Sequence, residues 1–327
     1  MQKLKDLIIE FEGRLKQEIS EIAVTSPKRL YEPIAYSLTL GGKRIRPALM
    51  LHAASLFSEE ITHVIPAAIA IEVFHNFTLL HDDIMDHADL RRGTPTIHKK
   101  YGENTAILSG DAMSIMAFSY LSKTDVSKLP ELLTLFSNTA IEVCEGQQYD
   151  MEFESRDDVT IDQYIEMIRL KTAVLIAASL KIGAFLGNAS ERDARLLYDY
   201  GINVGLAFQL QDDWLDVYGD EATFGKKIGG DILENKKTYL LLKALELSKD
   251  ENLISLKKWI SATNFDAPEK IAEVTHIFTE SGASDATNSR MQIYHDKALD
   301  CLSLINLPET EKAELTAFAG TVLSRVK

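Results

Sequence analysis

The sequence predicts an all-α protein. Apolar residues recur at helical spacing along almost the whole chain, and no strand-length segment alternates convincingly between apolar and polar residues. Only 17 glycines and 8 prolines occur among 327 residues, so few positions break a helix. Several segments, such as residues 173–180, are apolar on more than one face, which is typical of helices buried among neighbouring helices.

Twelve helices are expected from these patterns. Pro47 suits the first turn of the third helix, and Thr160 with Gln163 has the pattern of a capping box that opens the seventh. No linker rich in Gly, Pro or Ser divides the chain and no internal repeat is present, so we expect one domain over residues 1–327. The expected helices are residues 3–23, 27–39, 47–58, 64–88, 104–122, 130–153, 161–186, 191–218, 236–248, 266–280, 285–304 and 309–325.

The composition is that of an ordinary soluble protein, with 46% hydrophobic and 26% charged residues. The 35 basic and 49 acidic residues give a net charge of -14, which argues against nucleic acid as a partner. This charge does not exclude an anionic substrate, because a metal ion or a local basic cluster can reverse the field in one cleft.

The chain has the features of a cytoplasmic protein. Cys144 and Cys301 form no metal or redox motif, and we expect free thiols in the core. The first ten residues carry charges throughout and do not resemble a signal peptide. No uncharged run reaches the roughly 18 to 20 residues that span a bilayer, so no transmembrane segment is expected.

The segment that ends at Asp86 contains the pattern DDxxD on an expected helix. Asp82 and Asp86 are four residues apart and project from one face, whereas Asp83 is turned away by about 100°. Carboxylates so placed repel one another, and a bridging divalent cation is the commonest reason for keeping them. The pattern recurs at Asp212–Asp216. Two such motifs on helical segments argue against a purely structural role.

Basic residues lie in two segments near the first of these motifs. Gly41–Pro47 combines two glycines, three cations and a helix-starting proline, so it is either an anion clamp or a solvated basic turn. Arg91 and Arg92 follow Asp86 closely. They either form surface salt bridges or hold phosphates that metal ions do not cover, an arrangement that suits diphosphates.

The second half of the chain contains further candidates. Lys171 and Thr172 interrupt an apolar helix, where an unpaired lysine is costly to bury. Gln209 lies three residues before the second aspartate motif and on a similar face. A loop rich in glycine and lysine, Gly225–Asp231, and then Lys236 follow that helix. His75 lies about two turns before Asp82, and a lone histidine there is more often a core or surface residue than a ligand.

In their order along the chain these motifs resemble those of the trans-type polyprenyl diphosphate synthases, the farnesyl and geranylgeranyl diphosphate synthase family. The resemblance covers essentially the whole chain. Six motifs in the same order are highly specific for this family, whereas no single motif would be. The motifs are Gly41–Pro47, Asp82–Asp86 with Leu90–Gly93, Glu145–Asp150, Lys171–Thr172, Gln209–Asp216 and Lys227–Asp231.

The resemblance implies an isoprenoid synthase fold, a bundle of long helices around a central cavity, and a homodimer. It implies an enzyme that condenses isopentenyl diphosphate with C5 to C15 allylic diphosphates. It also implies up to three Mg²⁺ ions in each active site, with Mn²⁺ as an alternative. Cations of this kind meet the charge of the departing diphosphate, and a closed cavity shields the carbocation from water.

The resemblance assigns roles residue by residue. The metal ligands would be Asp82, Asp86 and Asp212, with Asp83 and Asp216 in support. The allylic diphosphate would be held by Arg91, Lys171, Lys227 and Lys236. Isopentenyl diphosphate would be bound by Lys43, Arg46, His75 and Arg92. Thr172 and Gln209 would lie beside the carbocation. Many relatives have a single lysine where this chain has Lys226 and Lys227, and Lys227 is aligned because Ile-Gly-Gly-Asp follows it.

The length of the product would be set below the first aspartate motif. Thr78 lies one turn before Asp82 and Phe77 one residue earlier, about 140° round the helix. In the family both positions line the floor of the cavity. An aromatic residue at position 77 followed by a small residue at position 78 resembles the pattern of short-chain enzymes in this family. We therefore expect C15 to C20 products, with C20 favoured.

Two other functions fit parts of the pattern. A terpene cyclase of the same fold also ionises allylic diphosphates at a DDxxD motif, but it normally has a second motif of Asn/Ser/Glu type and lacks a second basic site. A non-catalytic subunit of a heteromeric synthase usually loses an aspartate motif. This sequence keeps both aspartate motifs and the basic segment around Lys43 and Arg46.

Overall fold

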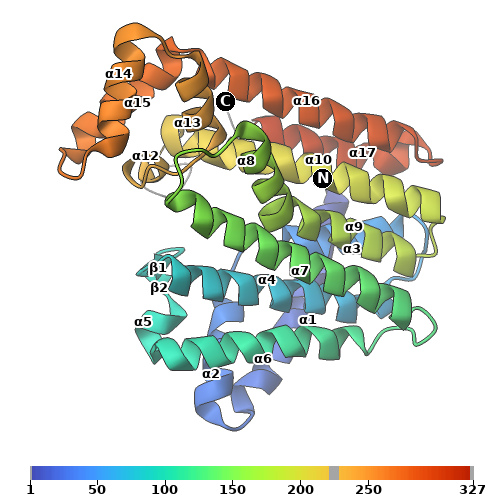
Figure 1. Cartoon of the computed structure of the whole chain (residues 1–327). Coiled ribbons are helices and arrows are strands. Elements are labelled where there is room, and N and C mark those ends of the chain that lie inside the picture. Colours follow the sequence, from blue (N-terminus) through green and yellow to red (C-terminus); the bar gives the residue numbers. More distant parts are fainter. Residues whose placement is uncertain (1, 221–227, 325–327) are drawn as a thin grey trace. The chain divides into compact units, whose positions relative to one another are not determined.

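The computed structural model describes residues 2–220 and 228–324, and nearly all of its regular structure is helical (Figure 1). Within these ranges the strands are β1 (Leu90–Arg91) and β2 (Thr94–Pro95), an antiparallel pair in which Leu90 lies opposite Pro95. The predicted all-α fold class is confirmed.

The chain divides into two compact units. The first comprises the chain up to Ala140, Leu175–Tyr198 and Asn306–Glu314, and the second comprises Ile141–Val174, Asp199–Ile305 and the chain from Leu315. The prediction of a single domain over residues 1–327 stays a prediction. Four helices contribute residues to both units: α7 (Leu129–Glu154), α9 (Val174–Leu186), α10 (Glu191–Tyr218) and α17 (Glu309–Ser324).

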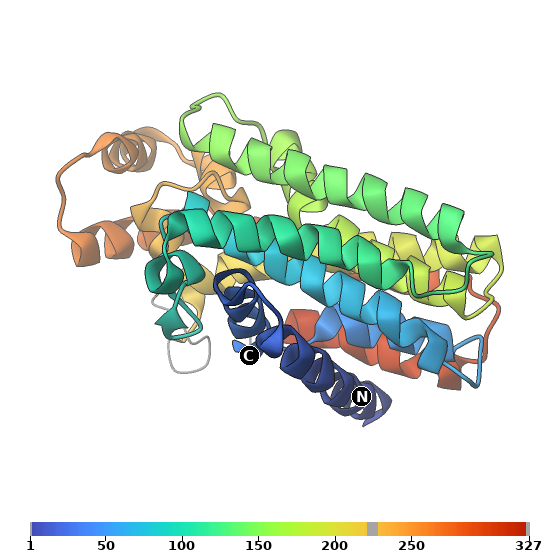
Figure 2. The ribbon, with the colours of Figure 1, turned by 90° about the horizontal axis from the view of Figure 1, so that it is seen from below.

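The first unit is built around α4 (Ile65–Met85). From Ile65 to Phe74 nearly every residue of α4 is buried, because small and branched apolar side chains cover all its faces. Helix α6 (Glu103–Leu121) runs beside α4, as both views show (Figures 1 and 2). The other helices of this unit are α1 (Gln2–Val24), α2 (Lys28–Thr39), α3 (Ile45–Ser55) and α5 (Ile97–Tyr101), with a 3₁₀ turn at Thr62–Val64.

One helical stretch, Thr62–Met85, is long and apolar enough to cross a membrane by length and composition. Two thirds of its apolar window, 67%, is buried inside the protein, and a core helix of a soluble protein passes the same test. The stretch is therefore weak evidence for a membrane span. The prediction that the chain has no transmembrane segment stays a prediction.

The second unit holds the remaining helices around a separate apolar core. This core includes Leu240 on α13 and Leu256 on α14, both fully buried. The elements are α8 (Ile161–Ile168), a π-helical segment (Arg169–Ala173), α12 (Gly230–Leu233), α13 (Tyr239–Leu247), α14 (Asp250–Ser261), α15 (Ala267–Glu280) and α16 (Ala283–Ser303).

Most of the expected helices agree with the observed ones to within a few residues, and two differences have clear causes. The helix expected over 161–186 contains the π-helical segment, which periodicity does not reveal. Its capping box is present, since Thr160 and Gln163 exchange hydrogen bonds of 3.2 and 3.0 Å. The helix expected to start at residue 236 starts at Tyr239, because the Thr238 hydroxyl caps it.

Some expectations were wrong. Helices α5, α12 and α14 were not anticipated; the first two are only five and four residues long, and α14 carries charges between its apolar positions. The thiols are free, as expected, but neither lies in the core, because Cys144 is exposed and Cys301 is half-buried.

Candidate active site

The first aspartate motif occupies the C-terminal end of α4. Asp82 is half-buried, Asp83 is buried and Asp86, the C-cap residue, is exposed. The backbone N–H of Asp86 donates to the carbonyl of Asp82 over 2.9 Å, so helical geometry continues through the motif. A helix C-terminus carries partial negative charge, which adds to the repulsion among three carboxylates. This end of α4 therefore favours cations.

One cation at this end belongs to the chain itself. Arg91, in the hairpin strand β1, donates from Nε to both carboxylate oxygens of Asp83 over 2.8 Å, and its Nη2 lies 3.4 Å from Asp82. Burial alone would lower the pKa of Arg91, but its bond to Asp83 and the charges of Asp83, Asp82 and Asp86 together outweigh burial and raise it. Burial raises the pKa of Asp83, and Arg91 opposes that shift. Asp83 thus fixes Arg91 beside Asp82.

The basic turn before α3 is held by a buried ion pair. Arg44 has a left-handed backbone with φ of 47°, is 6% exposed, and pairs with Glu72 of α4. Its Nη2 also donates to the carbonyl of Leu38 over 2.8 Å, while Asn76 donates to Glu72 over 3.0 Å. Removing one partner of a buried ion pair typically costs about 3–5 kcal/mol. The pair therefore fixes the turn that carries exposed Lys43 against α4.

The side chains of His75 and of Arg46, which belongs to this turn, contact each other. Arg46 Nη1 is 3.0 Å from His75 Nε2, and because a guanidinium can only donate, the imidazole accepts through Nε2. Burial, and after it the charge of Arg46, hold the pKa of His75 well below its ordinary value. Burial also lowers the pKa of Arg46 to about 10. At neutral pH the site therefore presents a charged Arg46 and a neutral His75.

Arg92 lies beside the same turn. Its Nη1 donates to the carbonyl of Gly41, and a Cβ placed on Gly42 would lie 2.8 Å from that nitrogen. The Arg92 side chain could move away from such a Cβ, but Gly42 also has a φ of 135°, which side chains rarely adopt, so the backbone itself requires glycine there. Arg91 and Arg92 both act on the pKa of His75, as Arg46 does, so the structure brings these three predicted arginines close to His75.

Phe77 and Thr78 lie one turn before the aspartates, and both are half-buried. The Phe77 ring contacts Phe74, with centroids 5.4 Å apart, and the His81 ring at 4.8 Å. Phe74 in turn contacts Phe136 at 5.2 Å. Phe77 is therefore held in a row of aromatic rings and has little freedom to move aside.

In the second unit, Lys171 and Thr172 lie in the π-helical segment, a feature that often marks functional sites. Lys171 Nζ donates to Asp150 of α7 over 2.6 Å, so the lysine is paired. A Cβ on Gly146 would lie 2.3 Å from the backbone nitrogen of Lys171, so glycine permits the close approach of α7. Thr172 donates to Gln209 over 3.0 Å. The two predicted neighbours of the carbocation are thus in contact.

Gln209 and Tyr164 support the second aspartate motif through Asp213. Gln209 Nε2 donates to Asp213 over 2.9 Å, and the Tyr164 hydroxyl donates to the other carboxylate oxygen. Asp213 is buried, and burial raises its pKa to about 6. Asp212 and Asp216 are half-buried on the same helix, near its C-terminal end.

The short helix α12 closes the motif from the other side. The backbone N–H of Asp231 donates to the Asp216 carboxylate over 2.9 Å, and Lys236 Nζ lies 3.8 Å from Asp231. Burial, and then the charges of Asp213 and Asp216, raise the pKa of Asp231 to about 8. Lys227 and Lys226 lie outside the described residues.

The carboxylates suit a metal that shares its coordination with a ligand. Among residues 2–220 and 228–324, no group of three or more His, Cys, Asp or Glu side chains is arranged to hold a metal ion. Mg²⁺ is usually bound by one or two carboxylates together with substrate phosphates and water, not by a complete protein cage. The donor set of Asp82 and Asp86, like that of Asp212 and Asp216, fits this mode.

Sequence reasoning assigned no role to the residues that hold the others in place, although Arg44, Asp150 and Asp213 lie within the quoted motifs. Arg44, Glu72, Asp150, Tyr164 and Asp213 are buried or paired and lie beside the predicted residues. Glu72 was detectable as a charge in the middle of an apolar helix, where an acid needs a partner. Tyr164 carries no such signal, because a tyrosine on an amphipathic helix is ordinary.

The fold and these two sets of carboxylates define an all-α protein equipped to bind diphosphates with divalent cations. The family model for polyprenyl synthetase matches residues 27–278. The chain belongs to the polyprenyl synthetase family, which uses divalent metal ions. The predicted family, isoprenoid synthase fold and prenyl-transferring enzyme class are confirmed.

Three similar proteins illustrate the relationship. A geranylgeranyl diphosphate synthase from Methanosarcina mazei is 39% identical over 311 residues, which cover 93% of this chain and 92% of that protein. A geranylfarnesyl diphosphate synthase from Natronomonas pharaonis is 40% identical, with 77% and 80% covered. A crystal structure of a geranylgeranyl pyrophosphate synthase is 47% identical, with a TM-score of 0.94 and both chains fully covered.

Proposed function

We propose that this protein condenses isopentenyl diphosphate with C5 to C15 allylic diphosphates and that geranylgeranyl diphosphate is the favoured product. The observation that carries the proposal is in the first unit, where Arg91 contacts Asp82 at the end of α4 and also acts, with Arg46 and Arg92, on His75. Similar proteins named geranylgeranyl diphosphate synthase support the product.

The carboxylates are proposed to bind Mg²⁺ together with the allylic diphosphate. The ligands are Asp82, Asp86 and Asp212, while Asp83 and Asp216 support them. Bound Mg²⁺ supplies positive charge that stabilises the departing diphosphate. Arg91, Lys171, Lys227 and Lys236 are proposed to hold the same diphosphate. For Arg91 the support is its fixed position against Asp83, which leaves its Nη2 near Asp82.

The basic turn is proposed to bind the diphosphate of isopentenyl diphosphate. Lys43, Arg46 and Arg92 supply charge, and His75 hydrogen-bonds to Arg46. Two arginines can each grip two phosphate oxygens, whereas Lys43 is exposed and can follow the ligand as a point charge. The buried Arg44–Glu72 pair holds this turn before any ligand arrives, which lowers the cost of ordering it on binding.

Thr172 and Gln209 are proposed to lie beside the carbocation. Their hydrogen bond fixes the Gln209 amide, whose nitrogen donates to Asp213 and whose oxygen accepts from Thr172. Neutral oxygens held in this way stabilise a developing positive charge without becoming nucleophiles. No described residue is assigned as the base, and the released diphosphate is proposed to take the proton.

A single assay tests the proposed reaction. Purified protein is incubated with Mg²⁺, isopentenyl diphosphate and, in separate tubes, the C5, C10 and C15 allylic diphosphates, and products are resolved by chain length. We expect elongation in each tube with C20 dominant, and none in a control with excess chelator. Absence of elongation in every tube contradicts the synthase and favours a non-catalytic subunit. Cyclic hydrocarbon released without consumption of isopentenyl diphosphate favours a terpene cyclase.

Phe77 and Thr78 are proposed to form the floor that ends chain growth. The row of rings Phe77, Phe74 and Phe136 supports this role, because each ring is braced by the next. Two similar proteins are named geranylfarnesyl diphosphate synthase, a name that denotes a C25 product.

Phe77→Ala is expected to shift the products from C20 to C25 and longer, because it removes a ring that is held against Phe74 and His81. The measurement is the chain-length distribution from the assay above. Phe57→Ala, which removes a half-buried ring after α3, is the control and should leave the distribution unchanged. An unchanged distribution in Phe77→Ala would show that this ring does not limit the product.

A homodimer in the cytoplasm is proposed as the working form. Helix α6 exposes Leu108, Ile115 and Phe118 by 59%, 69% and 37%, at spacings that place them on one side of the helix. Contiguous exposed apolar side chains mark protein interfaces. Light scattering should give twice the 36.5 kDa subunit mass, and Ile115→Glu should reduce it to one subunit. A monomeric wild-type protein contradicts this assignment.

A further inference from the structure

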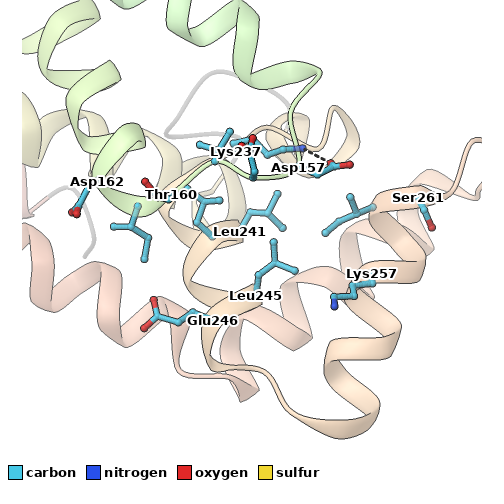
Figure 3. Close-up of a pocket in the computed structure, with 14 residues that line it drawn as sticks. Asp157, Thr160, Asp162, Lys237, Leu241, Leu245, Glu246, Lys257 and Ser261 are labelled. Carbon is cyan, nitrogen blue, oxygen red and sulfur yellow. Dashed lines mark ion pairs between the residues drawn. The ribbon is translucent and has the colours of Figure 1, made fainter.

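A pocket in the second unit lies outside every group of residues assigned above. Its volume is about 710 Å³, within the range of about 300–1,000 Å³ that is usual for small-molecule sites. The loop before α8, the start of α8, one face of α13 and the end of α14 form its walls (Figure 3). Two lining residues connect the pocket to the apolar core of this unit: Leu241 belongs to that core, and Ile260 packs against it.

The floor of this pocket is apolar and fixed. Leu241 and Leu242 are buried on α13, Leu245 is one turn further, and Val159 is buried in the loop opposite. Figure 3 shows the side chains of Leu241 and Leu245 directed into the pocket. The Thr160 capping box fixes the start of α8, and the Thr238 cap fixes the start of α13. The pocket is therefore preformed and does not depend on a moving segment.

A single lysine gives the pocket its polar end. The side chain of Lys237 is only 9% exposed, so its stem is buried while its ammonium reaches the pocket. Its ion-pair partner is Asp157, at 3.9 Å, whose side chain is 98% exposed (Figure 3). Because the Asp157 carboxylate is exposed, water competes with it for Lys237 and the pair is weak. A ligand anion that replaces Asp157 and excludes water would bind Lys237 more strongly.

The charges at the rim limit the ligand to one negative charge. Asp158 is paired with Arg156 over 2.7 Å and Glu246 with Lys243 over 3.0 Å, whereas Asp162 is exposed at the edge and repels a polyanion. Lys257, the other lysine of the pocket, is exposed and lies on α14. A diphosphate, with two or more charges, suits this rim poorly. A carboxylate matches the single buried cation.

We propose that this pocket binds an amphiphile with an apolar chain and a single anionic head group, its carboxylate on Lys237 and its chain over Leu241 and Leu245. The occupant would lie one residue from Lys236, in a segment held by hydrogen bonds from Lys236 N–H to Asp231 and from Thr238 N–H to the Lys236 carbonyl. The site is separate from the proposed reaction, and its occupancy is measurable without turnover.

Decanoate is a direct probe of this site. Calorimetric titration of the full-length protein should show saturable binding at one site per chain. Lys237→Met keeps the apolar stem and removes the charge, and we expect it to weaken binding about tenfold or more, since hydrogen bonds to charged groups contribute about 1.5–3 kcal/mol. The matched variant Lys257→Met should stay within about twofold of wild type, because exposed charges contribute little.

Three further arms make the result decisive. Decanol should bind more weakly than decanoate, and decylammonium more weakly still, because only the carboxylate pairs with Lys237. Geranyl diphosphate with Mg²⁺ should not displace decanoate. The proposal is overturned if decanoate does not bind, if Lys237→Met binds it as well as wild type, if decylammonium binds more tightly, or if geranyl diphosphate displaces it. Circular dichroism establishes that both variants are folded.

Discussion

Negative charge at the C-terminal ends of two long helices is the constraint on which the candidate site of each unit depends. Helix α4 ends in Asp82, Asp83 and Asp86, and the last turns of α10 carry Asp212, Asp213 and Asp216. Each helix dipole adds partial negative charge at the same end. Neither arrangement stabilises the helix that carries it, which supports the proposal that each motif is kept to bind cations.

In each unit the chain meets part of this charge with its own residues. In the first unit Asp83 accepts hydrogen bonds from Arg91. In the second unit Asp213 accepts hydrogen bonds from Gln209 and Tyr164. The central aspartate of each motif is thus buried and satisfied, while its neighbours Asp82, Asp86, Asp212 and Asp216 are less buried. This division fits the proposed roles of Asp82, Asp86 and Asp212 as metal ligands, and it leaves Asp83 and Asp213 to fix their surroundings.

Sequence patterns were sufficient to predict the fold class and the positions of most helices. The reason is that burial of α4 and α10 demands long runs of apolar residues at helical spacing. They were also sufficient to select the charged residues that gather around His75, since order along the chain is itself specific. They did not reveal Arg44 with Glu72, or Tyr164 with Asp213, because these pairs join residues 28 and 49 positions apart. Nor did they reveal the π-helical segment or the pocket at Lys237, which depend on packing rather than on local periodicity.

The most direct test of this account is the affinity for Mg²⁺ with and without an allylic diphosphate analogue that cannot ionise, measured by calorimetry. Because the described carboxylates form no complete metal cage, the account predicts weak Mg²⁺ binding alone and much tighter binding with the analogue. Asp82→Asn should remove most of the gain while the protein stays folded. Tight Mg²⁺ binding without the analogue, or an undiminished gain in Asp82→Asn, would contradict the account.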